Sequence, residues 1–196
     1  MTSRDRALWD AEAEDFDAEP DHGLRDPVVR DAWRTLLRSL LPPVPSRVAD
    51  LGCGTGTLAL LLAEDGHAVD GVNFSPEMIR RARAKPGRLQ ARASPSVTRR
   101  TRRWRPRRTT WRCAATSRGA LPAPADVLAR WVRLLRPEGR LVLIEGYWST
   151  GSGLTAAETL ALVAGAGLRA EHRPLQDRAY WGRTIDDERY AVVARL

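Results

Sequence analysis

The sequence predicts an α/β protein with a doubly wound, mostly parallel sheet. Strand-like and helix-like segments alternate from Arg47 onward, and a glycine cluster at residues 52–56 separates a predicted strand from a predicted helix. The apolar run Leu141–Ile144 has the pattern of a strand buried on both faces. Strands that alternate with helices form parallel sheets with right-handed crossovers. At 196 residues, the chain has the size of one such domain.

The individual elements follow from apolar spacing and from helix start and stop signals. The first clearly patterned helix spans about 26–41, because apolar residues recur there at helical spacing and Pro42 and Pro43 follow. Ser75, Pro76 and Glu77 form a helix start. The further predicted helices cover 58–64, 76–85, 124–135 and 155–164, and the predicted strands cover 47–51, 67–72, 141–144 and 189–196. We therefore expect N-terminal cap helices over 1–45 and a domain over 46–196 that ends in a strand pair.

Composition excludes several classes of protein. The longest apolar run, Leu58–Ala63, is far shorter than the roughly 20 residues of a membrane-spanning helix. The first fifteen residues hold five acids and no apolar region, so we expect no secretory leader and a cytoplasmic location. Two cysteines, Cys53 and Cys113, make neither a disulfide framework nor a four-ligand zinc site. We expect no metal.

The net charge of +8 comes from one segment. Residues 86–118 contain 11 Arg and no acid, and the rest of the chain has a net charge of −3. This segment is anomalous because it has neither a helical nor a strand period. Taken literally, its Arg-rich part, 98–108, with Trp104 and Trp111 for base stacking, is a basic nucleic-acid-binding loop.

A second interpretation of residues 86–118 comes from the genetic code. Codons for Thr109–Thr116, read in another frame, can encode Y-D-V-A-L-C-R-H-V. Ser96–Arg99 is likewise consistent with V-G-D-A. Only Lys85 among the 32 basic residues is lysine, as in a GC-rich genome, where shifted frames encode arginine. We interpret 86–118 as the product of two compensating frameshifts, and we expect disrupted central strands and impaired stability or activity. Residues 97–116 should be irregular or a poor imitation of the missing strands.

The glycine cluster at residues 52–56 is the candidate ligand-binding site. Residues 48–56 form a strand, a glycine turn and a helix start, an arrangement that exposes backbone amides to an anionic or nucleotide-type ligand. A nicotinamide fingerprint needs a sixth-position glycine where Thr57 stands, which weakens the interpretation as an NAD-dependent oxidoreductase. Asn73, about 20 positions after the first glycine, lies at the end of the next strand and can bond ribose hydroxyls.

Three segments resemble the class I S-adenosylmethionine-dependent methyltransferases of small-molecule, bacterial type. They are Asp50–Gly56, Gly71–Met78 and Leu135–Leu141, which resemble the first motif, the second strand with its turn, and the turn into the fifth strand. The resemblance implies a Rossmann-like sheet whose fourth strand lies beside the first. It also implies S-adenosyl-L-methionine as cofactor, with Asp50 at the methionine ammonium and Asn73, where the family usually has an acid, at the ribose. The implied cofactor-binding residues are Asp50, Gly52, Cys53, Gly54, Thr55, Gly56, Asn73 and Phe74.

Other candidate residues have structural alternatives. Cys53 is favoured as a small turn residue over a nucleophile, since no His or acid pairs with it in sequence. His22 could act as a base, but an exposed loop histidine is the preferred interpretation. Trp9 and Phe16 could contact the sulfonium, although packing of a helix on the core is the simpler role. The catalytic residues are unknown. The function predicted is methyl transfer to a small-molecule acceptor, with no specific nucleic acid and no membrane as partners.

Overall fold

One seven-stranded sheet organises the chain, in the order β3-β2-β1-β4-β5-β7-β6. The computed structural model describes residues 3–43, 45–87, 89–93, 109–115 and 123–196. Strands β1 (Arg47–Leu51), β2 (Ala68–Asn73), β3 (Gln90–Ala93), β4 (Thr109–Ala115) and β5 (Leu135–Tyr147) run parallel. Strands β6 (Arg169–Pro174) and β7 (Glu188–Arg195) form the antiparallel C-terminal pair. The predicted doubly wound α/β fold is confirmed.

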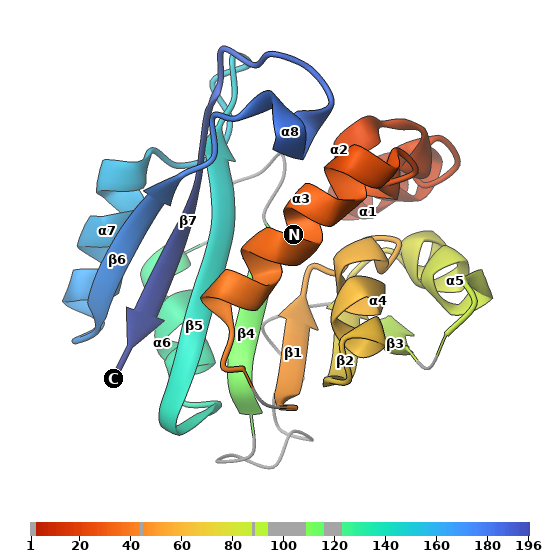
Figure 1. The fold of residues 1–196 in the computed structure, drawn as a ribbon. Coiled ribbons are helices and arrows are strands. Elements are labelled where there is room, and N and C mark those ends of the chain that lie inside the picture. Colours follow the sequence, from red (N-terminus) through yellow and green to blue (C-terminus); the bar gives the residue numbers. More distant parts are fainter. Residues whose placement is uncertain (1–2, 44, 88, 94–108, 116–122) are drawn as a thin grey trace.

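Helices cover both faces of the sheet (Figure 1). Helices α3 (Pro27–Leu40), α4 (Thr57–Glu64) and α5 (Pro76–Ala84) lie on one side, and α6 (Pro124–Val132) and α7 (Ala156–Gly165) lie on the other. A short helix, α8 (Arg178–Trp181), precedes β7. The N-terminal helices α1 (Ser3–Glu12), η1 (Phe16–Ala18) and α2 (Pro20–Gly23) sit beyond the arrowhead of β1. We call residues 3–23 the cap.

The helix starts follow the sequence signals. The side chains of Asp26 and Ser75 accept hydrogen bonds from the amides of Val28 and Met78, which caps α3 and α5. Thr155 and Glu158 form a capping box at the start of α7. Such caps satisfy amides that the first helical turn leaves unpaired. The predicted boundaries of these helices therefore agree with the structure to within one residue.

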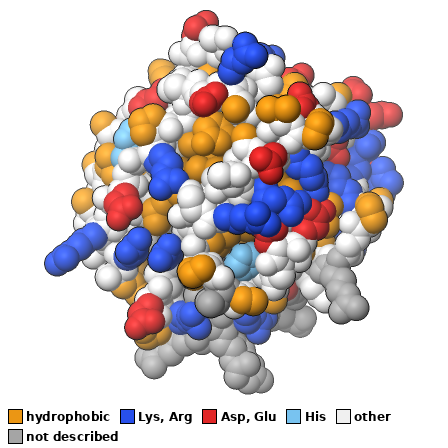
Figure 2. All heavy atoms as spheres, in the orientation of Figure 1, with side chains coloured by type: hydrophobic (Ala, Val, Ile, Leu, Met, Phe, Trp, Pro, Cys, Tyr) orange, Lys and Arg blue, Asp and Glu red, His pale blue; other side chains and the backbone are white. Residues whose placement is uncertain are grey.

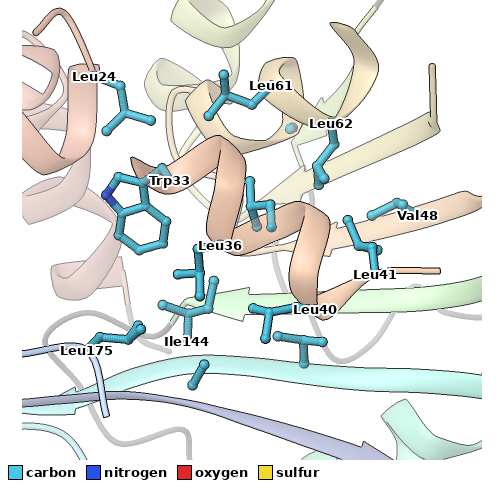
Figure 3. Packing of buried hydrophobic residues seen from close by; sticks show 14 of the residues in the cluster. Leu24, Trp33, Leu36, Leu40, Leu41, Val48, Leu61, Leu62, Ile144 and Leu175 are labelled. Carbon is cyan, nitrogen blue, oxygen red and sulfur yellow. The ribbon is translucent and has the colours of Figure 1, made fainter. Parts of the chain in front are cut away.

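Two hydrophobic cores lie against the two faces of the sheet. Figure 3 shows α3 residues Trp33, Leu36 and Leu40 packed between α4 and β5, where they meet Leu61 and Ile144. The other core joins α6 and α7 to β5 and β7 around the fully buried Tyr190. The same face that carries α3 and α4 bears acidic and basic side chains mixed on its surface (Figure 2). Arg34 and Arg38 of α3 bind Asp65, which follows α4.

The expectation of disrupted central strands is wrong for the described backbone. Strand β4 pairs with β1 from Val48↔Trp111 to Leu51↔Ala114, and with β5 as far as Ala115↔Ile144. The ladder irregularity between Thr109 and Trp111 lies opposite the turn at Glu138, whose φ is +65°. Backbone pairing in a parallel sheet needs only amides and carbonyls, so an unusual sequence can still complete the ladder. Residues 94–108 and 116–122 lie outside the described part of the chain, and they include most of the segment assigned to a frameshift.

None of the helices in the described residues is both long and apolar enough to cross a membrane.

Candidate cofactor site

The turn after β1 is built on glycine. Gly52, Gly54 and Gly56 have φ values of +91°, +52° and +80°, in the left-handed region that favours glycine. The amides of Gly52 and Cys53 donate to the Val72 carbonyl, at 2.7 and 3.1 Å. The amide of Gly56 donates to the Cys53 carbonyl at 2.7 Å. These bonds tie the turn to β2, so the ends of two neighbouring strands form one rigid edge.

A side chain is excluded at Gly54 and at Gly56 by different neighbours. A Cβ on Gly56 would lie 2.5 Å from Leu89 Cδ2 and 3.1 Å from Ala82 Cβ, so this glycine allows α5 to pack against the turn. A Cβ on Gly54 would lie 3.3 Å from the Phe16 ring. Gly54 therefore faces the cap rather than the protein interior.

Two features at this edge can recognise the ends of an amino acid. No side chain caps the N-terminus of α4, where Gly56 is the N-cap residue. Amides at such a terminus, with the positive end of the helix dipole, attract carboxylates. Asp50, 3% exposed, lies near the end of β1 beside this turn and supplies a negative charge suited to an ammonium group.

The turn after β2 holds Asn73 in one orientation. Asn73 is 7% exposed, and its Oδ1 accepts a hydrogen bond from the Ser75 amide at 2.9 Å. An asparagine amide keeps two N–H donors for a hydroxyl ligand after its oxygen is engaged. Phe74 is equally buried, and its ring makes an edge contact with Trp9 of the cap at 6.5 Å between centroids.

Cys53 has a packing role. A Cβ on Gly71 would lie 3.0 Å from the Cys53 Sγ, so the thiol fits over a glycine of β2. Burial raises the pKa of the Cys53 thiol well above its usual range, and the nearby Asp50 carboxylate raises it further. A thiol kept protonated is a poor nucleophile. The geometry agrees with the interpretation of Cys53 as a small turn residue.

The cap reaches both turns through acidic side chains. Asp10 Oδ1 accepts hydrogen bonds from the Ser75 hydroxyl and, at 3.3 Å, from the Glu77 amide. Asp17 accepts a 2.6 Å hydrogen bond from the Thr55 hydroxyl and pairs with Lys85 at 2.8 Å. Polar side chains of the cap therefore cover the turns at the ends of β1 and β2.

The cap also contacts the turns through aromatic rings. Phe16 stacks on His22 at 4.0 Å and makes an edge contact with Trp9 at 6.3 Å. The preferred interpretation of His22 as an exposed loop residue is wrong, because His22 lies in α2 with its side chain 33% exposed. Packing of Trp9 and Phe16 on the core is also wrong, because Trp9 contacts Phe16 and Phe74, and all three lie outside the two main cores. These contacts could not be predicted from the acid-rich N-terminal sequence. They form because the cap packs on the turns after β1 and β2 and not on the sheet.

A second cluster lies farther along the same edge, where β5 ends and β7 begins. The guanidinium of Arg189 lies 4.4 Å from the ring of Trp148 and 5.3 Å from that of Trp181. It also donates to Asp187 Oδ2 at 2.8 Å. Burial lowers the pKa of Arg189 from its usual value. Trp181 belongs to the core beneath this cluster, so Arg189 links Trp148, just after β5, to the packed interior.

Sequence reasoning missed Asp17, Lys85 and Arg189. Lys85 is the only lysine of the chain, which is a signal that could have singled it out. Asp17 is one of eight acids in the first 21 residues and carries no distinguishing spacing. The Arg-rich part, 98–108, lies outside the described residues, as do residues 116–122 and the side chain of Cys113. In the described part of the chain, no group of three or more His, Cys, Asp or Glu residues could hold a metal ion.

Comparison with known proteins agrees with this site. Residues 48–139, which include both turns, match a family model described as a methyltransferase domain. A protein of Geobacillus sp. (strain WCH70) assigned to the methyltransferases is 41% identical over 59 residues, 28% of this chain. The YqeM protein of Bacillus subtilis (strain 168), assigned likewise, is 40% identical over 55 residues, also 28% of this chain. These matches span only 24% and 22% of the two relatives.

Solved structures share the fold at low identity. A geranyl diphosphate methyltransferase bound to geranyl diphosphate and sinefungin has a TM-score of 0.66 and 19% identity over 84% of this chain and 77% of its own. A Haloferax volcanii methyltransferase in complex with the activator Trm112 has a TM-score of 0.69 and 20% identity, over 96% and 98% of the two chains. The [4+2]-cyclase SpnF, at a TM-score of 0.68 and 18% identity, covers 84% and 80%. Over residues 48–139 the chain therefore resembles the methyltransferase-domain family, and it shares its fold with S-adenosylmethionine-dependent methyltransferases of known structure.

Proposed function

We propose that the chain transfers the methyl group of S-adenosylmethionine to a small-molecule acceptor. The observation that carries this proposal is the edge where the glycine turn is hydrogen-bonded to β2, with an uncapped helix N-terminus and a buried carboxylate beside it. The charges at that edge are opposite to those of the carboxylate and ammonium groups at the amino-acid end of the cofactor. Asn73, one strand away, matches its ribose in hydrogen-bonding groups.

The residues present fit the cofactor. A side chain at Gly54 would fill the space in front of the turn, and the backbone bonds of the turn use the amides of Gly52, Cys53 and Gly56. We infer that the amides of Gly54 and Thr55 and the first turn of α4 bind the cofactor carboxylate. Asp50 binds the ammonium, and Asn73 donates to a ribose hydroxyl. Cys53 and Phe74 shape the turns that hold these groups, as Gly52 and Gly56 do.

S-adenosylmethionine supplies an electrophilic methyl group on its sulfonium. The protein contributes chiefly by holding the acceptor atom in line with that group, since well-oriented reactants gain much of the barrier reduction from proximity. The cap rings of Trp9 and Phe16 exclude water from this edge, and their π faces are suited to a sulfonium charge. No catalytic residue is assigned.

A small molecule is the acceptor that the surroundings favour. Trp148, whose ring lies 4.4 Å from the Arg189 guanidinium at the ends of β5 and β7, offers an aromatic surface of the kind that lines small-molecule sites. A neighbour in fold is named as a geranyl diphosphate methyltransferase, which supports this choice by analogy. The fold also serves a [4+2]-cyclase, so the fold alone does not decide the chemistry.

Transfer of a labelled methyl group tests the proposal. The purified chain is incubated with methyl-tritiated S-adenosylmethionine and with three fractions of a bacterial extract: small molecules that pass an ultrafilter, RNA and protein. We expect label only in the first fraction, and none with the Gly54→Val variant. Label in the RNA fraction alone would support the basic nucleic-acid-binding alternative instead.

Several finer expectations remain predictions. They are the cytoplasmic location, the division into cap helices at 1–45 and a domain at 46–196, the frameshift in 86–118 and the impairment that would follow from it. The methyltransferase match favours neither the nucleic-acid-binding nor the nicotinamide-dependent alternative.

A further inference from the structure

An ion pair joins the cap to the end of α5, and a hydrogen bond beside it joins the cap to the glycine turn. Asp17 lies 2.8 Å from the Lys85 ammonium, and the two side chains are 22% and 20% exposed. Lys85 also donates to the hydroxyls of Thr57, at 2.6 Å, and Thr55, at 3.1 Å. Asp17 accepts from the same Thr55 hydroxyl at 2.6 Å. Three separate segments, the cap, the glycine turn and the end of α5, therefore meet at one pair of charges.

The residue before Asp17 occupies the front of the turn. The Phe16 ring packs on Gly54 so closely that a Cβ there would lie 3.3 Å from it. Gly23 locks this part of the cap, because a Cβ on it would lie 2.0 Å from the Asp17 carbonyl oxygen. Because Phe16 and Asp17 are adjacent in the chain, movement of Asp17 away from Lys85 would carry the Phe16 ring with it. A ligand that approaches Gly54 from the side where a Cβ would project meets this ring.

The other polar anchor of the cap is separate from this pair. Asp10 of α1 binds the Ser75 hydroxyl and the Glu77 amide at the start of α5. Release of Asp17 would leave that anchor in place. Asp10 thus holds α1, and Glu19, farther along the cap, pairs with Arg183 at 3.7 Å. Asp17 is held by a pair of charges that water and salt can reach.

We propose that the Asp17–Lys85 ion pair is a latch that holds the cap closed over the glycine turn, and that cofactor exchange requires this latch to open. The proposal rests on the proposed function, because it assigns the ligand that must pass Phe16. A partly exposed ion pair is weak enough to break thermally and strong enough to bias the closed state. Lys85 is therefore a positioning residue, which acts through Asp17 and the two threonines.

Exchange kinetics and cap protection test the latch. The dissociation rate constant of tritiated S-adenosylhomocysteine is measured by displacement with unlabelled ligand for the wild type, Asp17→Asn, Lys85→Met and the double variant. Amide hydrogen exchange of residues 3–23 is measured without ligand. We expect each single variant to raise dissociation by about threefold to tenfold, in line with the loss of one partly buried pair. The double variant should match the singles, because both remove one interaction.

A matched control removes a charge from the same cap. Glu19 pairs with Arg183 at 3.7 Å, with both side chains more than half exposed, and Glu19→Gln makes the same charge change as Asp17→Asn. We expect Glu19→Gln to leave dissociation and cap exchange unchanged. Higher salt should speed dissociation from the wild type and have little effect on the double variant.

The outcomes separate the latch from the proposed function. Wild-type binding of S-adenosylhomocysteine, with faster cap exchange and faster dissociation only in the latch variants, supports the latch. Wild-type binding with unchanged rates in Asp17→Asn and Lys85→Met overturns the latch and leaves the proposed function standing. No binding by a folded wild type overturns both. Cap exchange that is unchanged in the latch variants overturns the latch whatever the ligand does.

Discussion

Cys53 lies directly over Gly71, with its Sγ only 3.0 Å from the position a Cβ would take on that glycine. The first turn of the cofactor site and the strand β2 are therefore matched in size at this point. Gly71→Ala should lower the melting temperature more than Cys53→Ala, because it forces an overlap in a closely packed place. The double variant Gly71→Ala/Cys53→Ala should recover part of the loss. A double variant no more stable than Gly71→Ala alone would contradict this packing role.

The same burial sets the reactivity of the thiol. Because burial and Asp50 raise the pKa of Cys53, the thiolate fraction at any given pH is lower than in a free thiol. Alkylation of Cys53 by iodoacetamide, followed by mass spectrometry of its peptide, should be slow at about pH 8, near the pKa of an ordinary thiol, and accelerate only at higher pH. Denaturant should restore the ordinary rate. Fast labelling of the folded chain at neutral pH would mean that Cys53 is an activated nucleophile after all.

Gly54 offers a comparison of two glycines with similar backbones. Gly54 has a φ of +52° and faces Phe16, whereas Gly66 has a φ of +89° and no heavy atom within 4 Å of where a Cβ would lie. Substitution by Ala strains both backbones, at about 1 kcal/mol each. Gly54→Ala should in addition weaken S-adenosylhomocysteine binding by about tenfold or more, equivalent to about 1.4 kcal/mol. Equal affinity losses in Gly54→Ala and Gly66→Ala would remove Gly54 from the site.

Asn73 gives a gain-of-affinity prediction. Its Oδ1 already accepts from the Ser75 amide, so Asp at this position can keep that bond and offer a charged oxygen to the ribose hydroxyls. Asn73→Asp should tighten S-adenosylhomocysteine binding severalfold, and Asn73→Ala should weaken it. Titration calorimetry measures both. Unchanged affinity in the two variants would place the ribose elsewhere.

His67 predicts a pH dependence of stability. Its Nδ1 accepts a hydrogen bond from the Ser46 amide at 3.1 Å, and burial lowers its pKa from 6.5. The unfolded chain then binds the proton more readily than the folded chain, so the free energy of unfolding falls as pH drops below the unfolded value. His67→Asn keeps an acceptor but does not titrate, and should flatten the dependence between about pH 7 and pH 5. A variant as pH-sensitive as the wild type there would assign the effect to another group.

The sheet could be predicted from sequence because its signals are local. Strand β1 matches the predicted 47–51, and the helix starts at Asp26 and Ser75 follow from their capping side chains. Strand β4 could not be predicted from Thr109–Ala115, because its place comes from β1 and β5 on either side. Neighbouring strands can thus impose an extended backbone where local spacing gives no signal.

The site was predictable on one side only. The glycine turn and Asn73 follow from motif residues, while the contacts of Asp17, Lys85 and His22 depend on how the cap folds back onto distant parts of the chain. Polar contacts between distant segments leave no periodic pattern in the sequence. The nucleotide sequence of the gene tests the frameshift predicted in 86–118.

Titration calorimetry with S-adenosylhomocysteine and with NAD, on the wild type and on Gly54→Val, tests the central claim most directly. A branched side chain at Gly54 would meet Phe16 and take the space in front of the turn. We predict one site for S-adenosylhomocysteine on the wild type, much weaker binding of NAD, and no binding of S-adenosylhomocysteine by a folded Gly54→Val chain. Preferential binding of NAD, or unchanged binding of S-adenosylhomocysteine by Gly54→Val, would contradict the assignment of the cofactor to this turn.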